Sequence, residues 1–274
     1  METLVYSYRG PLKDLSYSGS AAVVNSEGKL LFYCGEPQKT VYMRSSAKPM
    51  QAMSVLESGA VDAYGLTEEE LAVICSSHSG ESFHVNAIRS ILSKAGLGEE
   101  YLQCGVHAPL NEQAAKALEQ SGQAPGQIHN NCSGKHTGML ITAKHLGETL
   151  EDYYQPHHKV QQRIIEMIAN ICQYDREKIV IGVDGCGVPV HALPLYHAAW
   201  GAARMACPET LGDRGSHAAR IVSAMTAYPK MVSGTGRFDA MLMDEFQGNL
   251  FCKAGADGYE IVGIKDKGLG IAVK

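Results

Sequence analysis

The spacing of apolar residues changes twice along the chain. Near the N-terminus, short apolar runs separated by turn residues predict strands. Through the middle, apolar residues recur at three- and four-residue spacing, which predicts amphipathic helices. The C-terminal part returns to strands. The predicted strands cover 4–10, 20–35, 39–43, a buried strand in 178–187, and 248–274; the predicted helices cover 48–61, 67–77, 81–96, 111–122, 134–147, 157–173, 193–207 and 216–229.

This order of strands, then helices, then strands predicts an α+β fold. An alternating βαβ fold would mix the two kinds of element throughout, whereas segregation favours one antiparallel sheet built from both chain ends with a helical region between. The 274 residues, 45% of them hydrophobic, suit a single domain over 1–274 that can be divided into two lobes around one cleft. The fold would bring the residues near 45 and near 253 to that cleft.

Composition excludes several classes of protein. The net charge of −5 offers no basic footprint for nucleic acid. No apolar run reaches the ~20 residues that span a bilayer. The N-terminal segment METLVYSYRG lacks the pattern of a signal peptide, so we expect a cytoplasmic protein whose eight cysteines are reduced.

The segment YMRSSAKPMQ, residues 42–51, offers the first candidate chemistry. Ser45 and Lys48 lie three residues apart where a strand gives way to a helix, so a neutral Lys48 could accept the proton of a serine nucleophile. The alternative is a serine that caps the helix beside a solvated lysine. Spacing alone does not decide, since Ser26 and Lys29 share it within a predicted turn.

Two further segments carry similar residue types. ICSSHSGES, residues 74–82, places Ser77 among a dense run of hydroxyl groups after a helix. FCKAGADGYE, residues 251–260, places Lys253 in a strand beside a small residue and a glycine, where a substrate could approach the backbone. The alternatives are a polar capping loop and a bulge beside a surface lysine.

Two cysteines lie in glycine-flanked, polar segments. Cys132 opens a predicted helix in NNCSGKHTG, and Cys186 ends a predicted strand in VDGCGVP. Thiolates together with a nitrogen donor such as Lys135 could bind Zn²⁺, although the spacing is not that of a standard zinc finger. Two ordinary free thiols are the alternative.

Taken together, these segments resemble known families. Three motifs follow one another along the chain: Ser-x-x-Lys, a loop rich in hydroxyl groups, and Lys-x-Gly. In this order they resemble the motifs of the serine β-lactamase and penicillin-binding superfamily, and the serine-dependent glutaminases share this arrangement. The blocks MRSSAKPMQ, CSSHSGE, HNNCSGKHTGML, DGCGVP and KAGADG resemble more closely the L-asparaginase II family of bacterial amidohydrolases on the β-lactamase-like fold. This resemblance covers nearly the whole chain.

The resemblance implies a set of roles. It implies an L-asparaginase that forms an acyl-enzyme, with Ser45 as nucleophile beside Lys48, and Ser77 with Lys253 as a second Ser-Lys pair; which serine attacks stays open. It implies that Arg44, His136 and Asp184 hold the amino acid substrate, a small molecule. It also implies a zinc site of Cys132, Lys135 and Cys186 that positions groups rather than activating water. We further expect a homodimer.

Two other classes of protein stay open at this stage. One is a penicillin-recognising serine hydrolase, which shares the three motifs but acts outside the cytoplasm. The other is a zinc-bound substrate-binding protein with a degenerate active site. Members of the L-asparaginase II family continue past the final strand, whereas this chain stops at GLGIAVK. The completeness of the sheet and the activity are therefore questions for the structure and for experiment.

Overall fold

The computed structural model describes residues 2–274. A five-stranded antiparallel sheet has the strand order β4-β3-β10-β9-β8. Its strands come from both chain ends, as the sequence predicts: β3 (Ala21–Asn25) and β4 (Leu30–Cys34) from the first, and β8 (Leu250–Gly255), β9 (Tyr259–Ile264) and β10 (Leu269–Val273) from the second. The last strand lies in the middle of the sheet, where Ile271 pairs with Val23 on one side and with Val262 on the other.

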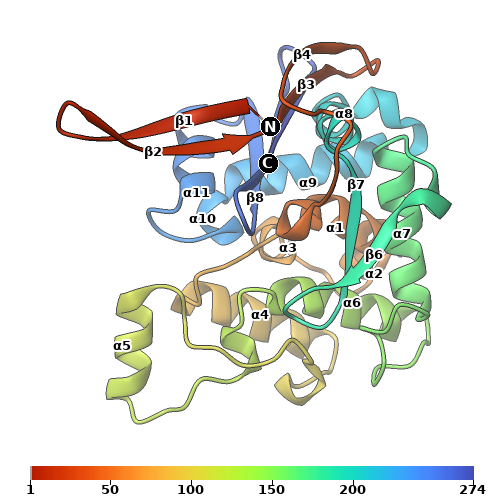
Figure 1. The fold of residues 1–274 in the computed structure, drawn as a ribbon. Coiled ribbons are helices and arrows are strands. Elements are labelled where there is room, and N and C mark those ends of the chain that lie inside the picture. The colour runs from red at the N-terminus through yellow and green to blue at the C-terminus, as the bar shows by residue number, and fades with distance from the viewer. Residues whose placement is uncertain (1) are drawn as a thin grey trace.

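Two smaller sheets accompany it. A hairpin of β1 (Glu2–Arg9) and β2 (Leu12–Gly19) projects from the body of the molecule (Figure 1). A three-stranded sheet has the order β5-β7-β6, with β5 (Thr40–Tyr42), β7 (Pro189–Pro194) and β6 (Val180–Val183). The predicted strand 39–43 therefore pairs with the middle of the chain rather than with the terminal sheet.

The helices form the rest of the molecule (Figure 1). They are α1 (Lys48–Glu57), α2 (Ala60–Ala63), α3 (Glu68–Ile74), α4 (Ser82–Lys94), α5 (Glu112–Gln120), α6 (Ser133–His145), α7 (Lys159–Ile171), α8 (Leu195–Ala206), α9 (Gly215–Ala227), α10 (Pro229–Val232) and α11 (Phe238–Glu245). Helix α1 is central: nine of its ten residues are buried, and it packs against α6, α7 and α9. Within residues 2–274, no helix combines the length and apolar character needed to cross a membrane.

The sequence patterns missed four elements. Strand β2 has a polar, exposed sequence, so it lacks the buried alternation that identifies a strand. Strand β7 is buried at every position and carries a proline at each end. Its sequence PVHALP therefore shows no alternation of apolar and polar residues, and the predicted helix 193–207 includes the last two residues of the strand. Helices α10 and α11 are short and lie on either side of the glycine-containing loop 233–237, so neither is long enough to show a clear helical period.

Candidate active site

Three chain segments meet at one small cavity, as the sequence analysis expects for the residues near 45 and near 253. Ser45 lies in a 3-10 turn, η1 (Arg44–Ala47), directly before α1. Ser77 follows the C-terminal end of α3, and Lys253 lies on β8. The cavity has a volume of about 160 Å³ and is also lined by Asn131, Ser233, Arg237, Asp239, Ala254, Gly255 and Ala256.

Lys48 is buried beside this cavity and donates to several acceptors. Its Nζ lies 2.9 Å from the Ser77 Oγ, 2.6 Å from the Ser76 carbonyl oxygen and 3.3 Å from the Cys132 Sγ. Burial lowers the pKa of Lys48, and the neighbouring lysines lower it further, although Cys132 opposes them. Lys48 is therefore a buried amine whose neutral form is favoured and which already contacts a serine hydroxyl.

Lys253 is fully buried and faces a carboxylate. Its Nζ lies 3.3 Å from the Asp239 Oδ2 and donates to the Ala254 carbonyl oxygen at 2.7 Å. The same carboxylate oxygen accepts from the Ala254 backbone N–H at 3.1 Å. Asp239 thus holds both the lysine side chain and the strand that carries it.

The hydrogen bonds of the two lysines differ from the Ser-Lys pairs that the family resemblance implies. Lys48 donates to Ser77 rather than to Ser45, and Lys253 pairs with Asp239 rather than with Ser77. The physical reason is that a helical side chain leans toward the preceding turn, and α1 packs that side of Lys48 under the 75–79 loop. Within residues 2–274 the Ser45 hydroxyl makes no hydrogen bond, so it stands free at the cavity.

Arg44 precedes Ser45 in an unfavourable backbone conformation. Its φ is 53°, in the left-handed region that non-glycine residues seldom occupy. Its guanidinium holds Asp184 at 3.0 Å and Asp257 at 2.5 Å. Burial would raise the pKa of Asp184, but Lys135, the Gly185 N–H and Arg44 outweigh it and lower that pKa. Arg44 and Asp184 therefore neutralise each other in this structure.

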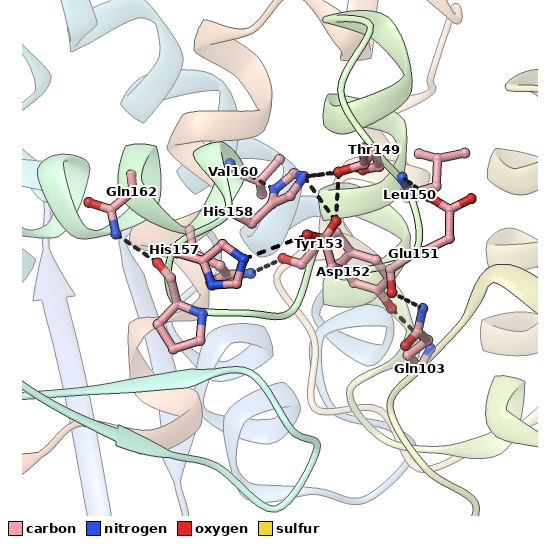
Figure 2. A network of polar contacts seen from close by, with 12 residues as sticks. Gln103, Thr149, Leu150, Glu151, Asp152, Tyr153, His157, His158, Val160 and Gln162 are labelled. Atoms are coloured by element: carbon pink, nitrogen blue, oxygen red, sulfur yellow. Dashed lines mark hydrogen bonds and ion pairs between the residues drawn. The ribbon is translucent and has the colours of Figure 1, made fainter.

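His136 is oriented by a tyrosine. The Gln103 backbone N–H donates to the Tyr153 hydroxyl at 3.0 Å, and that hydroxyl lies 2.7 Å from the His136 Nδ1. Figure 2 shows how the loop around Tyr153 is held, with Gln103 also donating to the Glu151 carbonyl oxygen at 2.6 Å. If the tyrosine donates to Nδ1, the proton of the imidazole is on Nε2, which is buried without a partner in the described chain. Burial, with Lys135, lowers the pKa of His136 to about 3, so this imidazole is neutral.

Cys132, Lys135 and Cys186 lie together, as the proposed metal ligands should. Helix α6 begins directly after Cys132 and carries Lys135, whose Nζ is 3.1 Å from the Cys186 Sγ. The Cys132 thiol and Lys135 stabilise the Cys186 thiolate and lower its pKa to about 4 despite burial, while the same contact raises the pKa of Cys132 to about 12. In the described residues no group of three or more His, Cys, Asp or Glu side chains forms a metal site, so a lysine would have to be the third donor here.

Four residues at the cavity escaped the sequence analysis, namely Asn131, Ser233, Arg237 and Asp239. Asn131 lies inside a block already singled out for its cysteine. The other three belong to the segment SGTGRFD, residues 233–239, which covers the loop between α10 and α11 and the first turn of α11. Its two glycines in three residues were the available signal, because such spacing is typical of a shaped loop.

Comparison with known proteins agrees with this architecture. The family model of L-asparaginase II matches residues 5–274. No curated protein matches significantly. Among solved structures, a Bacteroides dorei protein provisionally assigned as a β-lactamase aligns with a TM-score of 0.50 at 12% identity, over 93% of this chain and 84% of that one.

Two structures of a protein named Mglu, one determined in 4.3 M NaCl, align less well. Their TM-scores are 0.40 at 13% and 14% identity; 93% of this chain is covered, but only 60% and 55% of theirs. The Bacteroides dorei protein supports the β-lactamase-like fold, and the family match extends over almost every residue. The chain belongs to the L-asparaginase II family and is an L-asparaginase-like amidohydrolase.

Proposed function

We propose that the protein hydrolyses L-asparagine to L-aspartate and ammonia through a serine acyl-enzyme. The observation that carries this proposal is the single cavity shared by Ser45, Ser77 and Lys253, with the Lys48 Nζ 2.9 Å from the Ser77 hydroxyl. A serine hydroxyl in contact with a buried amine is an arrangement that activates a nucleophile for attack on an amide.

The size of the cavity favours an amino acid over a penicillin. Pockets for drug-sized ligands measure roughly 300–1,000 Å³, whereas this cavity has about 160 Å³. Ammonia release from L-asparagine, D-asparagine and L-glutamine, beside nitrocefin turnover, decides between the two classes. Hydrolysis of nitrocefin without ammonia release from any of the three amides would end the asparaginase proposal.

The contact between Lys48 and Ser77 suggests a route for the proton, which also requires the Ser45 hydroxyl to turn toward Ser77. Neutral Lys48 accepts the Ser77 proton, Ser77 accepts the Ser45 proton, and the Ser45 Oγ attacks the side-chain carbonyl carbon. Collapse of the tetrahedral intermediate breaks the C–N bond, and the leaving nitrogen takes the proton back through the same relay as ammonia. Water then attacks the ester, giving its proton to the relay, and L-aspartate departs as Ser45 is reprotonated. Lys253, paired with Asp239, supplies an N–H donor at the wall of the cavity.

The nucleophile is identified by replacement. We expect Ser45→Ala and Lys48→Met to lower kcat on the order of 10⁶-fold, as loss of a committed nucleophile or its base does. Mass spectrometry of quenched reactions should find the acyl group on Ser45. Ser26→Ala, at the unrelated Ser-x-x-Lys spacing, is the matched control and should keep full activity.

A contrary result would reassign the roles. If Ser45→Ala kept a substantial fraction of activity and the acyl group appeared on Ser77, then Ser77 would be the nucleophile, deprotonated directly by the Lys48 that contacts it.

A zinc site at Cys132, Lys135 and Cys186 is a second element of the proposal. The Cys186 sulfur contacts both the Lys135 nitrogen and the Cys132 sulfur, and two sulfurs with one nitrogen are donor types that zinc accepts. Bound zinc would supply a fixed positive centre, which needs Cys132 and Lys135 to be deprotonated. Asp184 and His136 lie within two residues of these donors, so the site would position the groups that the family pattern assigns to substrate binding.

Elemental analysis and kinetics test this site. We expect one zinc per chain, and in Cys186→Ser we expect KM to rise far more than kcat falls. Cys132→Ser is less clean, because Cys132 also contacts Lys48 at 3.3 Å. Wild-type protein without metal after preparation in zinc-containing buffer, or Cys186→Ser with unchanged KM, would return both cysteines to ordinary thiols.

A further inference from the structure

The loop Ser233–Arg237, with the sequence SGTGR, reaches the cavity at both of its ends. It joins α10 to α11, and Ser233 and Arg237 line the same cavity as Ser45, Ser77 and Lys253. The roles assigned so far use neither residue.

This loop is fixed against the serine-rich segment that carries Ser77. The Ser77 backbone N–H donates to the Val232 carbonyl oxygen at 2.9 Å, just before the loop. Within the loop, the Thr235 N–H donates to the Glu81 Oε1 at 2.9 Å, and the Ser79 hydroxyl donates to the same oxygen at 2.7 Å. Gly234 has a φ of 135°, and a Cβ there would lie 2.0 Å from the Ser79 Oγ, so only glycine allows this approach. The loop is therefore built in one conformation.

Two polar groups on this loop lack partners. The Ser233 Oγ belongs to a side chain that is 3% exposed and finds no hydrogen bond in the described part of the chain. A buried hydroxyl without a partner is costly, which points to a ligand that completes it. The Arg237 side chain is exposed and makes no hydrogen bond or ion pair within residues 2–274, so its guanidinium is free to meet a ligand.

The other basic side chains near the cavity are already engaged. Arg44 is held by Asp184 and Asp257, and Lys253 is held by Asp239. Lys48 donates to backbone and side-chain acceptors. Arg237 is thus the cavity-lining cation that remains available for an anionic ligand among the described residues.

We propose that Arg237 binds the α-carboxylate of the substrate and that the Ser233 hydroxyl donates a hydrogen bond to it, an inference that rests on the proposed amidase function. A guanidinium offers a carboxylate two parallel N–H donors, which fixes both position and orientation. The loop then selects free amino acids, because a side-chain amide within a peptide has no free α-carboxylate at this place. Arg44, which the family pattern assigns to substrate binding, is paired with Asp184 and Asp257 in this structure.

The test compares a substrate that has the carboxylate with one that lacks it. Ammonia release is measured from L-asparagine and from its neutral α-methyl ester, for wild type, Arg237→Gln, Arg237→Lys and Ser233→Ala. Loss of a charge-assisted contact should lower kcat/KM for L-asparagine in Arg237→Gln by roughly 10- to 100-fold, mostly through KM, and leave the ester unchanged. Arg237→Lys should recover part of the loss, and Ser233→Ala should lose roughly 3- to 10-fold.

Arg89→Gln is the matched control. Arg89 is an exposed arginine paired with Glu99 at 2.7 Å and does not line this cavity, so its replacement should change neither substrate. If Arg237→Gln kept the wild-type preference for L-asparagine over the ester, the inference would be wrong while the asparaginase proposal stood.

If the wild type releases no ammonia from L-asparagine, the proposed function is wrong. The inference about Arg237 is then tested by a separate binding measurement. Calorimetric titration with L-aspartate then decides: binding to wild type that weakens at least 10-fold in Arg237→Gln supports the inference. Equal binding to both proteins, or none to wild type, overturns it.

Discussion

At the residue scale, burial rather than spacing decides what Lys48 does. Ser45 and Lys48 lie three positions apart, yet the amine turns to Ser77 because α1 buries the lysine under the loop after α3. Ser26 and Lys29 have the same spacing but lie at a partly exposed turn, where the lysine stays in water. A charged Lys48 would lose its hydration in its buried position, so burial favours the neutral form of Lys48, which can accept a proton.

We expect activity to rise with pH because Lys48 must be neutral to act as a base. Protonated Lys48 cannot accept a proton, and its pKa lies below the ordinary 10.5 through burial and neighbouring lysines. On the acid side of that pKa, log kcat/KM should climb by about one per pH unit. The measurement is kcat/KM for L-asparagine from pH 6 to pH 10, over which the fold is checked by circular dichroism. A flat profile would contradict Lys48 as the base.

Sequence patterns located this site better than they described its contacts. Hydrophobic periodicity predicts a sheet built from both chain ends, which brings the residues near 45 and near 253 to one cleft, whereas only the family resemblance adds Ser77. The Asp239 contact to Lys253 was not visible, since it depends on how a short helix docks on β8. Arg237 was missed for the same reason. The catalytic, substrate-binding and zinc roles themselves stay predictions.

At the element scale, the close packing of α8 on the central sheet explains several small residues. Helix α8 crosses β10, β3 and β9, and its alanines let its backbone approach the strands. A Cβ on Gly270 would lie 1.9 Å from the Ala199 carbonyl oxygen, and one on Gly263 would lie 2.8 Å from that of Ala202. The backbones of helix and sheet are therefore in direct contact. The sequence shows only that the helix is rich in alanine and does not reveal this contact.

Gly270→Ala should consequently destabilise the protein. The added methyl group meets main-chain atoms that cannot move aside without shifting α8 away from the sheet, so we expect a loss of about 3 kcal/mol in the free energy of unfolding. For a chain of this size that lowers Tm by roughly 10 °C. Gly126→Ala is the control, since its nearest atom would be 3.9 Å away and its φ is −113°, and it should change stability by less than about 0.5 kcal/mol. Equal melting temperatures for the two variants would contradict this packing.

At the scale of the whole molecule, the β1–β2 hairpin stands apart from the core (Figure 1). Its register pairs Val5 with Tyr17 and Ser7 with Leu15, and Arg9 with Leu12, so these apolar residues share one face. All four are large and exposed, with Leu12 the most at 70%. A two-stranded hairpin is only marginally stable by itself, and an exposed apolar face is a common mark of an interface.

The neighbouring edge strand also exposes apolar side chains. The Cys34 thiol at the end of β4 donates to the Glu2 carboxylate at 2.9 Å, which joins the strand to the base of the hairpin. Strand β4 is an edge of its sheet and exposes Leu31, Phe32 and Tyr33. Seven large apolar side chains, each about half exposed, present on the order of 600 Å², close to the roughly 800 Å² that each partner of a stable interface contributes.

We therefore expect a homodimer in which a second copy of this chain covers the hairpin and β4. Light scattering coupled to size exclusion should give twice the 29.5 kDa chain mass. Replacing Leu12, Leu15 and Tyr17 together by serine removes most of the apolar face without touching the cavity, so this variant should elute as a folded monomer. Leu110→Ser, at an exposed apolar residue in the loop before α5, is the control and should remain dimeric. A wild type that elutes as a monomer at micromolar concentration, or a triple variant that stays dimeric, would show that this surface has another role.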